Sequence, residues 1–549
     1  MRIEDIEREG FEVYGSRKQE ITGIAYDSRA VLPGFLFVAV RGERFDGSDF
    51  IEAAVEKGAA AVLYGKDPAR TERYEALRKR FPGVAWVAVE DCRDALAYAA
   101  SVFYRRPSEE CTVIGITGTN GKTTTSYLIK GIVERGGGSA GLIGTISYLI
   151  KDTVYDAPHT TPEAPDFQKL LRDMADEGCS HVISEVSSHA LAQKRVEYTR
   201  FRVGVFTNLT RDHLDFHLTM EEYYRAKERL FIELVEGNGA AVVNTDDPYG
   251  RRLAATLRER REGMRVITFG IEDRGADVFA HAIEASFKGT AFTVRIGEKQ
   301  EEFFTPLVGN TNVYNVLSAV CVAVSLHIPV ETIKEGVSMT GLVKGRFEKV
   351  DLGQDFLAVV DYAHTEDALE RLLMTARQLL EAYRFAERTD RMMRAKKKRF
   401  SLPGGRETES GKIITVIGCG GNRDKGKRSK MGEIASKLSD FVIVTSDNPR
   451  SEDPRAIIRD IEKGIKTDNY IVIPDRGVAI SMAVELASSG DIVLVAGKGH
   501  EDYQEMQGIR HRFSDRTALE DAIKRTTGRA FRGIPPVKGA PRSDRNCTL

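Results

Sequence analysis

Short runs of apolar, often β-branched residues recur along the chain, and longer segments with helical spacing separate most of them. The clearest runs are residues 112–116, 181–184, 203–206, 413–417, 441–444 and 491–495. Because these runs are apolar on both alternating faces, they predict strands of a parallel sheet that helices cover on both sides. Residues 123–134 carry apolar side chains at helical spacing directly after the first of these runs. The pattern therefore predicts an α/β protein.

Three blocks of this pattern predict three domains. A length of 549 residues is enough for about three to four domains, so one compact core is not expected. We expect a first domain over residues 1–108, a central domain with a parallel sheet and a P-loop-type ATPase site over residues 109–344, and a Rossmann-like α/β domain over residues 345–527. Residues 384–411 interrupt the third block with a basic run, which predicts a solvated insertion that catalysis does not need. Residues 528–549 predict a disordered tail.

Composition excludes several classes of protein. The 80 Lys and Arg residues nearly balance the 81 Asp and Glu residues, which argues against a protein whose overall field attracts nucleic acid. The chain has no stretch of about 18 uninterrupted apolar residues, so no membrane span is predicted. The six cysteines are scattered without a CxxC pair, so neither a zinc site nor a disulfide framework is predicted. We expect a cytoplasmic monomer whose partners are small molecules.

The sharpest local feature is the sequence Gly118-Thr119-Asn120-Gly121-Lys122-Thr123, which follows a predicted strand and opens a predicted helix. Glycines let backbone N–H groups approach an anion, and the N-terminus of a helix adds positive potential. Lys122 can contact the β- and γ-phosphates of a nucleotide, and the Thr123 hydroxyl can bind Mg²⁺. A strict Walker loop would have glycine at the position of Ile116, so this is a shorter variant of a phosphate-binding loop.

Two further predicted strands are followed by groups that bind metal ions. Glu185 comes directly after residues 181–184, and His213 follows residues 203–206 within a short loop. Ligands of parallel sheets gather at the carboxyl ends of the strands. We therefore expect Glu185 and His213 to meet Thr123 around Mg²⁺-ATP.

These features are part of a longer series of motifs that occur in a fixed order. After the phosphate loop the series runs through Glu185-Val186-Ser187-Ser188-His189-Ala190-Leu191, Asp212-His213-Leu214-Asp215, Asn312-Val313-Tyr314-Asn315, Gly345-Arg346-Phe347-Glu348, Asp361-Tyr362-Ala363-His364-Thr365, residues 418–428, Asp447-Asn448-Pro449-Arg450 and Gly497-Lys498-Gly499-His500-Glu501. With this series the chain resembles the ATP-dependent Mur ligases over about residues 20–525. Among these it is most similar to members that add a diamino acid to a UDP-N-acetylmuramoyl dipeptide.

The resemblance implies a reaction of peptidoglycan-precursor synthesis. ATP phosphorylates the terminal carboxylate of UDP-MurNAc-L-Ala-D-Glu, and an amine of meso-diaminopimelate attacks the acyl phosphate to give an amide and phosphate. A free carboxylate is a poor electrophile because its oxygen is a poor leaving group, and phosphorylation removes that obstacle. Phosphoryl transfer to an anion needs positive charge, which Lys122 and Mg²⁺ can supply. The resemblance also assigns UDP-MurNAc binding to residues 1–108 and implies domain closure around the substrates.

The resemblance also assigns roles to residues by position. It implies catalytic roles for Lys122, His213 and Lys227, with Thr123 and Glu185 on one Mg²⁺ and His213 on a second. Lys227 is implied to be carbamylated, which would make it a metal ligand, whereas read without the resemblance it is a helical lysine on the surface. The implied ATP contacts are Gly118, Thr119, Asn120, Gly121, Lys122, Thr123, Thr124, Asn315, Arg346 and Asp361, with His364 also near the nucleotide. The implied UDP-MurNAc-dipeptide contacts are Ser28, Glu43, Arg44, Phe45, Thr160, Thr161, Ser187, Gln193 and Arg195, and Arg29 is a further candidate because Arg binds phosphate and carboxylate groups.

The turn Asp447-Asn448-Pro449-Arg450 bears on which amino acid is added. Meso-diaminopimelate differs from lysine by one carboxylate, and a guanidinium can hold that group in a bidentate pair. Members that add lysine lack an arginine at the position of Arg450, so the resemblance implies diaminopimelate, with discrimination on the order of 10³-fold. The implied diaminopimelate contacts are Arg428, Asp447, Asn448, Pro449, Arg450, Gly497 and Glu501, the last of them facing the distal ammonium.

Three alternatives stay open at this point. The first is a ligase of the same family that adds L-lysine. The second is a ligase similar to folylpolyglutamate synthetase, which would share the phosphate loop without the motifs at residues 187–191 and 447–450. The third is a nucleotide-binding module without catalysis, although such a module has no need of Lys122, Glu185, His213 and Lys227 together.

Overall fold

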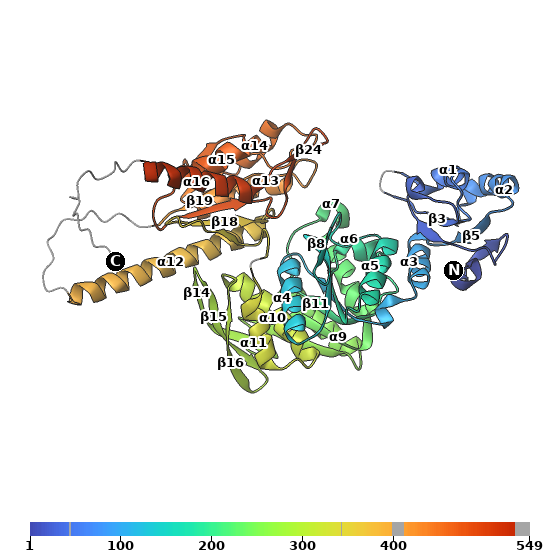
Figure 1. Ribbon diagram of the computed structural model, residues 1–549, viewed down its shortest axis with the longest axis horizontal. Coiled ribbons are helices and arrows are strands. Elements are labelled where there is room, and N and C mark those ends of the chain that lie inside the picture. The colour runs from blue at the N-terminus through green and yellow to red at the C-terminus, as the bar shows by residue number, and fades with distance from the viewer. Residues whose placement is uncertain (43–44, 342, 398–410, 533–549) are drawn as a thin grey trace, which may run out of the picture. The chain divides into compact units, whose positions relative to one another are not determined.

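The computed structural model describes residues 1–42, 45–341, 343–397 and 411–532 (Figure 1). Their contacts divide the chain into two compact units, Met1–Val343 and Lys344–Leu549. A further division near residue 108 stays a prediction.

The first unit begins with a sheet of five strands in the order β1-β5-β4-β3-β2, in which only β1 runs antiparallel to its neighbour. The strands are β1 (Glu12–Tyr14), β2 (Gly23–Ala25), β3 (Phe35–Ala39), β4 (Ala61–Gly65) and β5 (Ala85–Val89), and the helices are α1 (Ile51–Glu56), α2 (Thr71–Arg80) and α3 (Cys92–Phe103). Side chains of α1 and α2 pack on one face of this sheet, and side chains of α3 pack on the other. Asp91 begins α3 because its carboxylate accepts hydrogen bonds from the backbone N–H groups of Arg93 and Asp94.

The rest of the first unit is built on an eleven-stranded sheet with the order β16-β15-β14-β13-β12-β11-β6-β10-β7-β8-β9. Strands β7, β10, β6, β11, β12, β13 and β14 run parallel, whereas β8, β9, β15 and β16 add antiparallel edges. The strands are β6 (Thr112–Thr117), β7 (Ala140–Ile143), β8 (Ser147–Ile150), β9 (Thr153–Asp156), β10 (His181–Glu185), β11 (Phe201–Phe206), β12 (Val235–Asn244), β13 (Arg265–Gly270), β14 (Val278–Ser286), β15 (Gly289–Ile296) and β16 (Lys299–Thr305). The helices are α4 (Lys122–Arg135), α5 (Ala164–Asp176), α6 (Ser188–Ala192), α7 (Leu214–His217), α8 (Met220–Arg229), α9 (Pro248–Arg260), α10 (Asn310–Ser325) and α11 (Val330–Met339).

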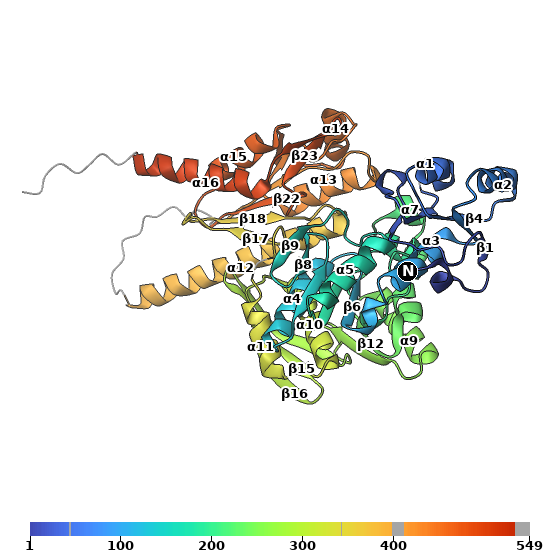
Figure 2. The ribbon, with the colours of Figure 1, turned by 45° about the vertical axis from the view of Figure 1, so that its right-hand side comes forward.

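Strand β6 lies in the middle of this sheet, and its alternating side chains enter two different cores. Ile114 and Ile116 pack with residues of α4, α10 and α11 on one face, whereas Val113 packs with residues of α5, α8 and α9 on the other. Figures 1 and 2 both show α5 beside α3. The five-stranded sheet therefore lies on the side of the eleven-stranded sheet that α5 covers. Burial on both faces is the physical reason for the continuous apolar runs in the sequence.

The second unit has a six-stranded sheet with the order β17-β18-β22-β19-β20-β21, in which only β17 is antiparallel to its neighbour. The strands are β17 (Glu348–Val350), β18 (Leu357–Asp361), β19 (Ile413–Ile417), β20 (Phe441–Val444), β21 (Tyr470–Val472) and β22 (Ile492–Ala496), and a separate hairpin contains β23 (Tyr503–Met506) and β24 (Ile509–Arg512). The helices are α12 (Glu366–Lys397), α13 (Gly426–Leu438), α14 (Pro454–Glu462), α15 (Arg476–Leu486) and α16 (Asp515–Arg532). Side chains of α15 and α16 fill the core on one face of this sheet.

The predicted α/β fold with parallel sheets is confirmed, but two segments differ from the prediction. Helix α12 continues through Lys397, so the first half of the predicted insertion at residues 384–411 is helical. This part of the chain is rich in Arg, Lys, Ala and Met, which are good helix formers, and the sequence interpretation gave too much weight to its charge. Helix α16 likewise extends to Arg532, past the predicted start of the tail at residue 528, while residues 398–410 and 533–549 lie outside the described part of the chain.

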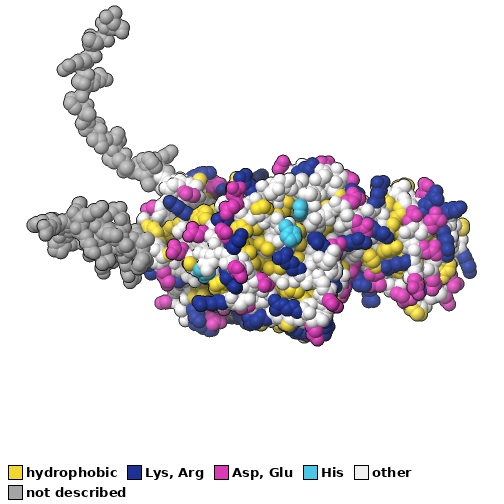
Figure 3. Space-filling view, turned by 90° about the horizontal axis from the view of Figure 1, so that it is seen from below, with side chains coloured by type: hydrophobic (Ala, Val, Ile, Leu, Met, Phe, Trp, Pro, Cys, Tyr) yellow, Lys and Arg dark blue, Asp and Glu magenta, His cyan; other side chains and the backbone are white. Residues whose placement is uncertain are grey.

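The surface agrees with the balanced composition. On the face shown in Figure 3, basic and acidic side chains are intermingled, and neither sign forms a continuous patch over that face. No described helix is both long enough and apolar enough to cross a membrane.

Candidate active site

The loop between β6 and α4 has the backbone shape of a phosphate-binding loop. Gly118 has φ of +145° and Gly121 has φ of +88°, a region that L-residues with side chains rarely adopt. A Cβ atom on Gly118 would lie 1.9 Å from Thr207 Oγ1, and one on Gly121 would lie 2.4 Å from Asn315 Oδ1. Glycine is therefore required at both positions, and the predicted nucleotide contact Asn315 lies directly against the loop.

Neighbouring strands hold this loop in place. Lys122 Nζ donates hydrogen bonds of 2.9 Å to the carbonyl oxygens of Gly118 and Thr119, so the loop folds around its own ammonium group. The backbone N–H of Asn120 donates to Asn208 Oδ1 at 2.9 Å, and Asn208 follows β11. Since β11 is the neighbour of β6 in the sheet, the contact is a direct consequence of strand order.

Glu185 ends β10, the other neighbour of β6, and its buried carboxylate faces the start of α4. Thr123 Oγ1 donates to Glu185 Oε2 at 3.1 Å. Thr145 approaches from the end of β7, with its backbone N–H 2.9 Å from Oε1 and its hydroxyl 2.9 Å from Oε2. Thr160 extends the set, because its hydroxyl lies 3.0 Å from that of Thr145. The structure thus brings Thr123 and Glu185 together, as the sequence predicted.

Lys227 lies in α8, and the expectation of a surface lysine is wrong. Its side chain is only 1% exposed, and Nζ donates to the carbonyl oxygen of Gly118 at 2.9 Å. The ammonium also lies 4.7 Å from the ring centre of Tyr223. Burial, reinforced by the positive charge of Lys122, holds the pKa of Lys227 well below its ordinary value. The sequence pattern missed this burial because it depends on how α8 packs beneath the loop.

His213 sits beside the same loop in a cluster of aromatic rings. Its ring centre is 4.7 Å from that of His189 and 6.1 Å from that of Tyr223, the ring that also contacts Lys227. His213 Nε2 lies 3.3 Å from Asp212 Oδ2. Burial is the main cause that lowers the His213 pKa to about 3; the charge of Asp212 opposes it, and the positive charges of His189, Lys227 and Lys122 add to it. The lysines therefore lie within electrostatic reach of His213.

Most residues predicted for the UDP-MurNAc dipeptide form one connected group in the first unit. Thr161 Oγ1 donates to the Glu185 carbonyl oxygen at 2.8 Å and accepts the backbone N–H of Ser187 at 3.1 Å. Arg195 Nη1 donates to the Thr161 carbonyl oxygen at 3.0 Å, and its Nε donates to Gln193 Oε1 at 3.0 Å. This group is therefore anchored to the same strand end as the phosphate loop.

The remaining predicted contacts of the first unit lie beside the small sheet. Ser28 begins a short 3-10 turn (Ser28–Ala30) after β2, and the Arg29 side chain is 88% exposed and paired with Asp27. Phe45 is 70% exposed. Glu43 and Arg44 fall outside the described residues.

In the second unit, the predicted nucleotide residues surround the end of β18. The Asp361 carboxylate accepts the backbone N–H groups of Phe347 at 2.6 Å and Ala363 at 2.7 Å. Arg346 stacks on the Tyr362 ring, with 4.7 Å from its Cζ to the ring centre, and His364 packs on the same ring at 4.5 Å. Burial raises the pKa of Asp361 despite its two donors. The structure brings Arg346, Asp361 and His364 together around Tyr362.

The turn at residues 447–450 lies at the carboxyl ends of β20 and β22. Asn448 Nδ2 donates to Glu501 Oε2 at 2.8 Å, and Arg450 Nη1 donates to the Gly421 carbonyl oxygen at 2.8 Å. A Cβ atom on Gly497 would lie 2.9 Å from Asp447 Oδ2, so the end of β22 closely approaches the turn. Arg450 follows Pro449 and has φ of +52°. Its backbone N–H donates to the carbonyl oxygen of Glu505 in β23 at 3.0 Å. Five of the predicted diaminopimelate contacts, and Pro449 between them, thus form one group.

Arg428 requires a correction, because its guanidinium is already engaged inside the protein. Its side chain is 1% exposed, with Nη2 3.0 Å from Glu452 Oε1 and Nη1 3.1 Å from Asp460 Oδ2. Nη2 also donates to the Gly420 carbonyl oxygen at 3.3 Å. The structure therefore places Arg428 behind the loop that Arg450 contacts, as a support for it rather than an open binding group.

Sequence reasoning assigned no role to several residues that hold these groups. Lys498 is fully buried, and its Nζ donates to Asn448 Oδ1 at 3.0 Å and to Glu501 Oε2 at 2.9 Å. Thr145 and Asn208 serve Glu185 and the phosphate loop in the same way. Lys498 and Asn208 stand just after predicted strands, which was a usable signal, whereas nothing in the sequence distinguishes Thr145.

Comparison with known proteins decides the family. Models of the Mur ligase family match three stretches: its catalytic domain matches residues 20–104, its middle domain residues 116–323, and its glutamate ligase domain residues 401–499. The chain belongs to the Mur ligase family. This Mur ligase is 41% identical to the UDP-N-acetylmuramoyl-L-alanyl-D-glutamate–2,6-diaminopimelate ligase of Geobacter metallireducens, over 95% of this chain and 98% of that one.

Two further relatives carry the same description. The enzyme of that name from Caldanaerobacter subterraneus is 43% identical over 90% of this Mur ligase and 92% of its own length. A solved structure of a ligase with this name superposes with a TM-score of 0.64 at 29% identity, covering 96% of this chain and 99% of that one. The prediction of a Mur ligase is confirmed, while the roles of individual residues stay predictions.

Proposed function

We propose that this Mur ligase uses ATP to join meso-diaminopimelate to the D-glutamyl carboxylate of UDP-N-acetylmuramoyl-L-alanyl-D-glutamate. The observation that carries this proposal is that each unit has a distinctive group of side chains at the ends of its strands. One is a glycine-dependent phosphate loop with a buried lysine and a buried carboxylate around it. The other is an arginine-bearing turn that is joined to Glu501 and Lys498. Relatives at 41–43% identity that are named for this reaction support the same substrates.

The first chemical step activates the carboxylate. A carboxylate oxygen of the dipeptide attacks the γ-phosphorus of ATP, the bond to the bridging oxygen breaks, and ADP leaves with that electron pair. Lys122 is suited to this step because its ammonium lies in the loop where the phosphates of a nucleotide would bind. The backbone N–H groups at the start of α4 and the positive end of the helix favour the same anion.

The residues around Glu185 fit Mg²⁺. Within the described residues, no three His, Cys, Asp or Glu side chains come together as a metal cage. Glu185 instead offers one carboxylate beside the hydroxyl of Thr123, a set that suits an ion which keeps water and substrate phosphates as its other ligands. We assign Thr123 and Glu185 to this ion, and His213 with Lys227 to a second position. Bound Mg²⁺ would offset the charge that develops on the transferring phosphoryl group.

Lys227 can serve such a position only after modification, since an ammonium is no metal ligand. Carbamylation joins the lysine nitrogen to the carbon of CO₂ and releases a proton, and it requires the neutral amine. Burial and the nearby Lys122 favour the neutral amine by lowering the pKa of Lys227. The same burial excludes bulk water from the modified group.

The second step forms the amide. An amine of diaminopimelate attacks the acyl carbon, and the tetrahedral intermediate expels phosphate. We assign recognition of the diaminopimelate carboxylate to Arg450, and recognition of its distal ammonium to Glu501. Asn448 and Lys498 hold Glu501 in place through hydrogen bonds of 2.8 and 2.9 Å. A lysine substrate lacks the carboxylate that Arg450 would bind, so the turn favours diaminopimelate over lysine.

The test is phosphate release by the purified full-length protein with ATP, Mg²⁺ and UDP-MurNAc-L-Ala-D-Glu, offered meso-diaminopimelate or L-lysine in turn. We expect turnover with diaminopimelate and at least about 10³-fold lower kcat/KM with lysine. Equal use of both amino acids would favour the lysine-adding alternative. If phosphate is released with neither amino acid, the proposed function is overturned.

A further inference from the structure

Helix α6 ends in a Schellman motif whose left-handed position is occupied by lysine. The backbone N–H of Arg195 donates to the Ala190 carbonyl oxygen at 2.8 Å, and that of Lys194 donates to the Leu191 carbonyl oxygen at 3.3 Å. Lys194 has φ of +55°. Glycine is the usual residue here because a side chain makes this conformation less favourable. The choice of lysine therefore points to a role for its side chain.

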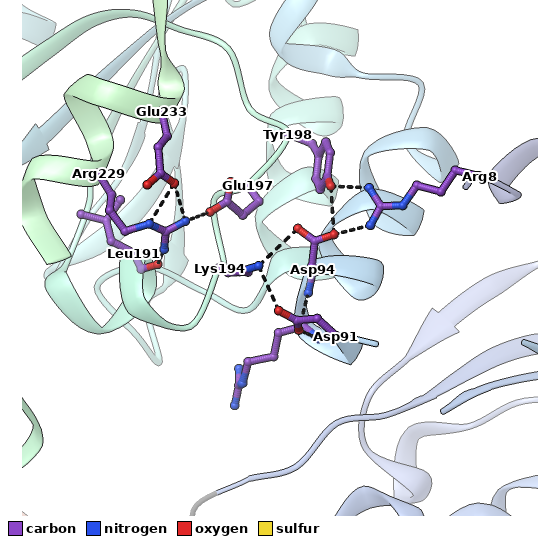
Figure 4. Close-up of polar contacts among 10 residues, drawn as sticks. Arg8, Asp91, Asp94, Leu191, Lys194, Glu197, Tyr198, Arg229 and Glu233 are labelled. Atoms are coloured by element: carbon purple, nitrogen blue, oxygen red, sulfur yellow. Dashed lines mark hydrogen bonds and ion pairs between the residues drawn. The ribbon is translucent and has the colours of Figure 1, made fainter. Parts of the chain in front are cut away.

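The Lys194 side chain connects the end of α6 to the small N-terminal sheet. Its Nζ lies 2.9 Å from Oδ2 of Asp91, the N-cap of α3, and 3.5 Å from Oδ1 of Asp94 in the first turn of α3 (Figure 4). The ammonium thus lies on the acidic start of a helix that belongs to a different sheet.

Tyr198 makes a second connection four residues further on. It too has a left-handed backbone, with φ of +58°, and its hydroxyl donates to Asp94 Oδ2 at 3.0 Å. Arg8 hydrogen-bonds to both the Tyr198 hydroxyl and Asp94, as Figure 4 shows. Both unusual backbone conformations of the loop therefore direct a side chain to Asp94.

The opposite side of the loop is held by α8, the helix that carries Lys227. Arg229 donates a hydrogen bond to the Leu191 carbonyl oxygen and pairs with Glu197 and, at 2.7 Å, with Glu233 (Figure 4). The loop is therefore fixed to α3 on one side and to α8 on the other.

The two neighbours of Lys194 in the sequence, Gln193 and Arg195, are predicted to contact the MurNAc peptide. Arg195 Nη2 lies 3.0 Å from Glu163 Oε1, and Glu163 lies 3.7 Å from Arg93 Nη1 in α3. The start of α3 is therefore linked to the Gln193–Arg195 segment by two sets of ion pairs. One is made by Lys194 itself, and the other runs from Arg93 through Glu163 to Arg195.

We propose that Lys194 and Asp94 are positioning residues that hold Gln193 and Arg195 in register for the sugar-peptide substrate. This inference rests on the proposed function and deepens it. The ion pairs fix the loop relative to α3 before substrate arrives, so that less conformational freedom is lost on binding. Their effect falls on the UDP-MurNAc dipeptide, since no described contact joins Lys194 or Asp94 to the phosphate loop.

The experiment compares Lys194→Gly with Lys151→Gly in the full-length protein. Lys151, in the turn between β8 and β9, is a matched control because it also has a left-handed backbone, with φ of +52°, and an ion pair, 4.0 Å from Glu177. Glycine suits both backbones, so neither variant should lose thermal stability. Calorimetry gives Kd for UDP-MurNAc-L-Ala-D-Glu and for a non-hydrolysable ATP analogue, and steady-state kinetics give kcat and each KM.

We expect Lys194→Gly to weaken binding of the UDP-MurNAc dipeptide about three- to tenfold, with kcat and ATP affinity within about twofold of wild type. Lys194→Arg should restore most of the affinity, and Lys151→Gly should match wild type. Unchanged dipeptide affinity in Lys194→Gly, or an equal loss in Lys151→Gly, would overturn the positioning role. Wild-type protein that binds the dipeptide without turnover would instead count against the proposed function.

Discussion

The ammonium of Lys227 donates a hydrogen bond of 2.9 Å to the carbonyl oxygen of Gly118, a residue 109 positions away in the sequence. This contact joins α8 to the first glycine of the phosphate loop. It also places an amine with a depressed pKa, an aromatic ring and a second lysine in one small volume. A site with this composition is suited to covalent modification of the amine, because the neutral form is the one that reacts with CO₂.

The first prediction concerns this lysine. Replacing Lys227 with Ala should lower kcat by at least about 10²-fold, because it removes the carbamate that we assign to the second Mg²⁺ position. Acetate or formate should restore part of the lost activity by occupying the vacated volume with a carboxylate. The measurement is phosphate release with and without added carboxylate. Lys130→Ala in α4 is the control and should behave like wild type, because the described contacts pair this lysine with Glu134 alone.

The second prediction tests the shape of the phosphate loop. Gly121→Ala places a methyl group 2.4 Å from Asn315 Oδ1 at φ of +88°, whereas Gly137→Ala meets nothing within 4 Å at φ of +82°. Both variants should lose about 1–2 kcal/mol because alanine disfavours this backbone, and Gly121→Ala should lose more because its methyl group displaces Asn315. Only Gly121→Ala should also weaken binding of an ATP analogue, by at least about tenfold. Equal nucleotide affinity in the two variants would show that contact with Asn315 does not shape the loop.

The sequence was sufficient to predict those contacts of this site that depend on local sequence pattern and on the order of the strands. The strands that precede Gly118 and Glu185 were predicted from their apolar runs, and the rule that ligands gather at carboxyl ends of parallel strands then placed Thr123 beside Glu185. The burial of Lys227 was missed, since it depends on the packing of α8 against a loop 109 positions away. Arg428 was misassigned for a related reason. Its ion partners Glu452 and Asp460 follow a different strand, and no local pattern joins them to it.

The third prediction concerns the choice of amino acid. Arg450→Lys keeps a positive charge but loses the planar fork that binds a carboxylate through two hydrogen bonds. We expect kcat/KM for meso-diaminopimelate to fall about 10²- to 10³-fold while KM for ATP stays near its wild-type value. Arg510→Lys in β24, whose guanidinium stacks on Tyr503, is the control. If Arg450→Lys still discriminates against lysine as strongly as wild type, the specificity lies elsewhere.

The fourth prediction is a pH dependence of stability at Glu452. The Arg428 guanidinium, with help from the backbone N–H of Asn422, lowers the pKa of Glu452 to about 2, against an ordinary value of 4.5. A carboxylate whose pKa is depressed in the folded state stabilises the fold above the unfolded-state pKa and loses that contribution as the pH falls toward about 2. Glu452→Gln should therefore cost about 1 kcal/mol at neutral pH, and its difference from wild type should shrink below about pH 4.5. Urea unfolding at a series of pH values measures this, with Glu331→Gln, an exposed residue of α11, as the control.

The last prediction concerns a fully buried ion pair that positions the end of β22. Arg476 opens α15 and Asp515 opens α16, both side chains are 0% exposed, and Nε lies 2.7 Å from Oδ1. Nη2 of Arg476 also donates to the Ala496 carbonyl oxygen at 2.9 Å, just before Gly497. Arg476→Met leaves the Asp515 carboxylate buried and unpaired, which should lower the free energy of unfolding by about 3–5 kcal/mol.

The double variant Arg476→Met/Asp515→Leu removes both charges and should recover most of that stability, because two apolar side chains of similar size incur no desolvation penalty. Arg459→Met breaks an exposed pair with Asp453 on α14 and should change stability by less than about 1 kcal/mol. Urea unfolding of the full-length chain measures all three variants. Because Arg476 also holds the strand end that carries Gly497, the double variant should regain stability without regaining full affinity for diaminopimelate. Recovery of both together would show that the ion pair serves folding alone.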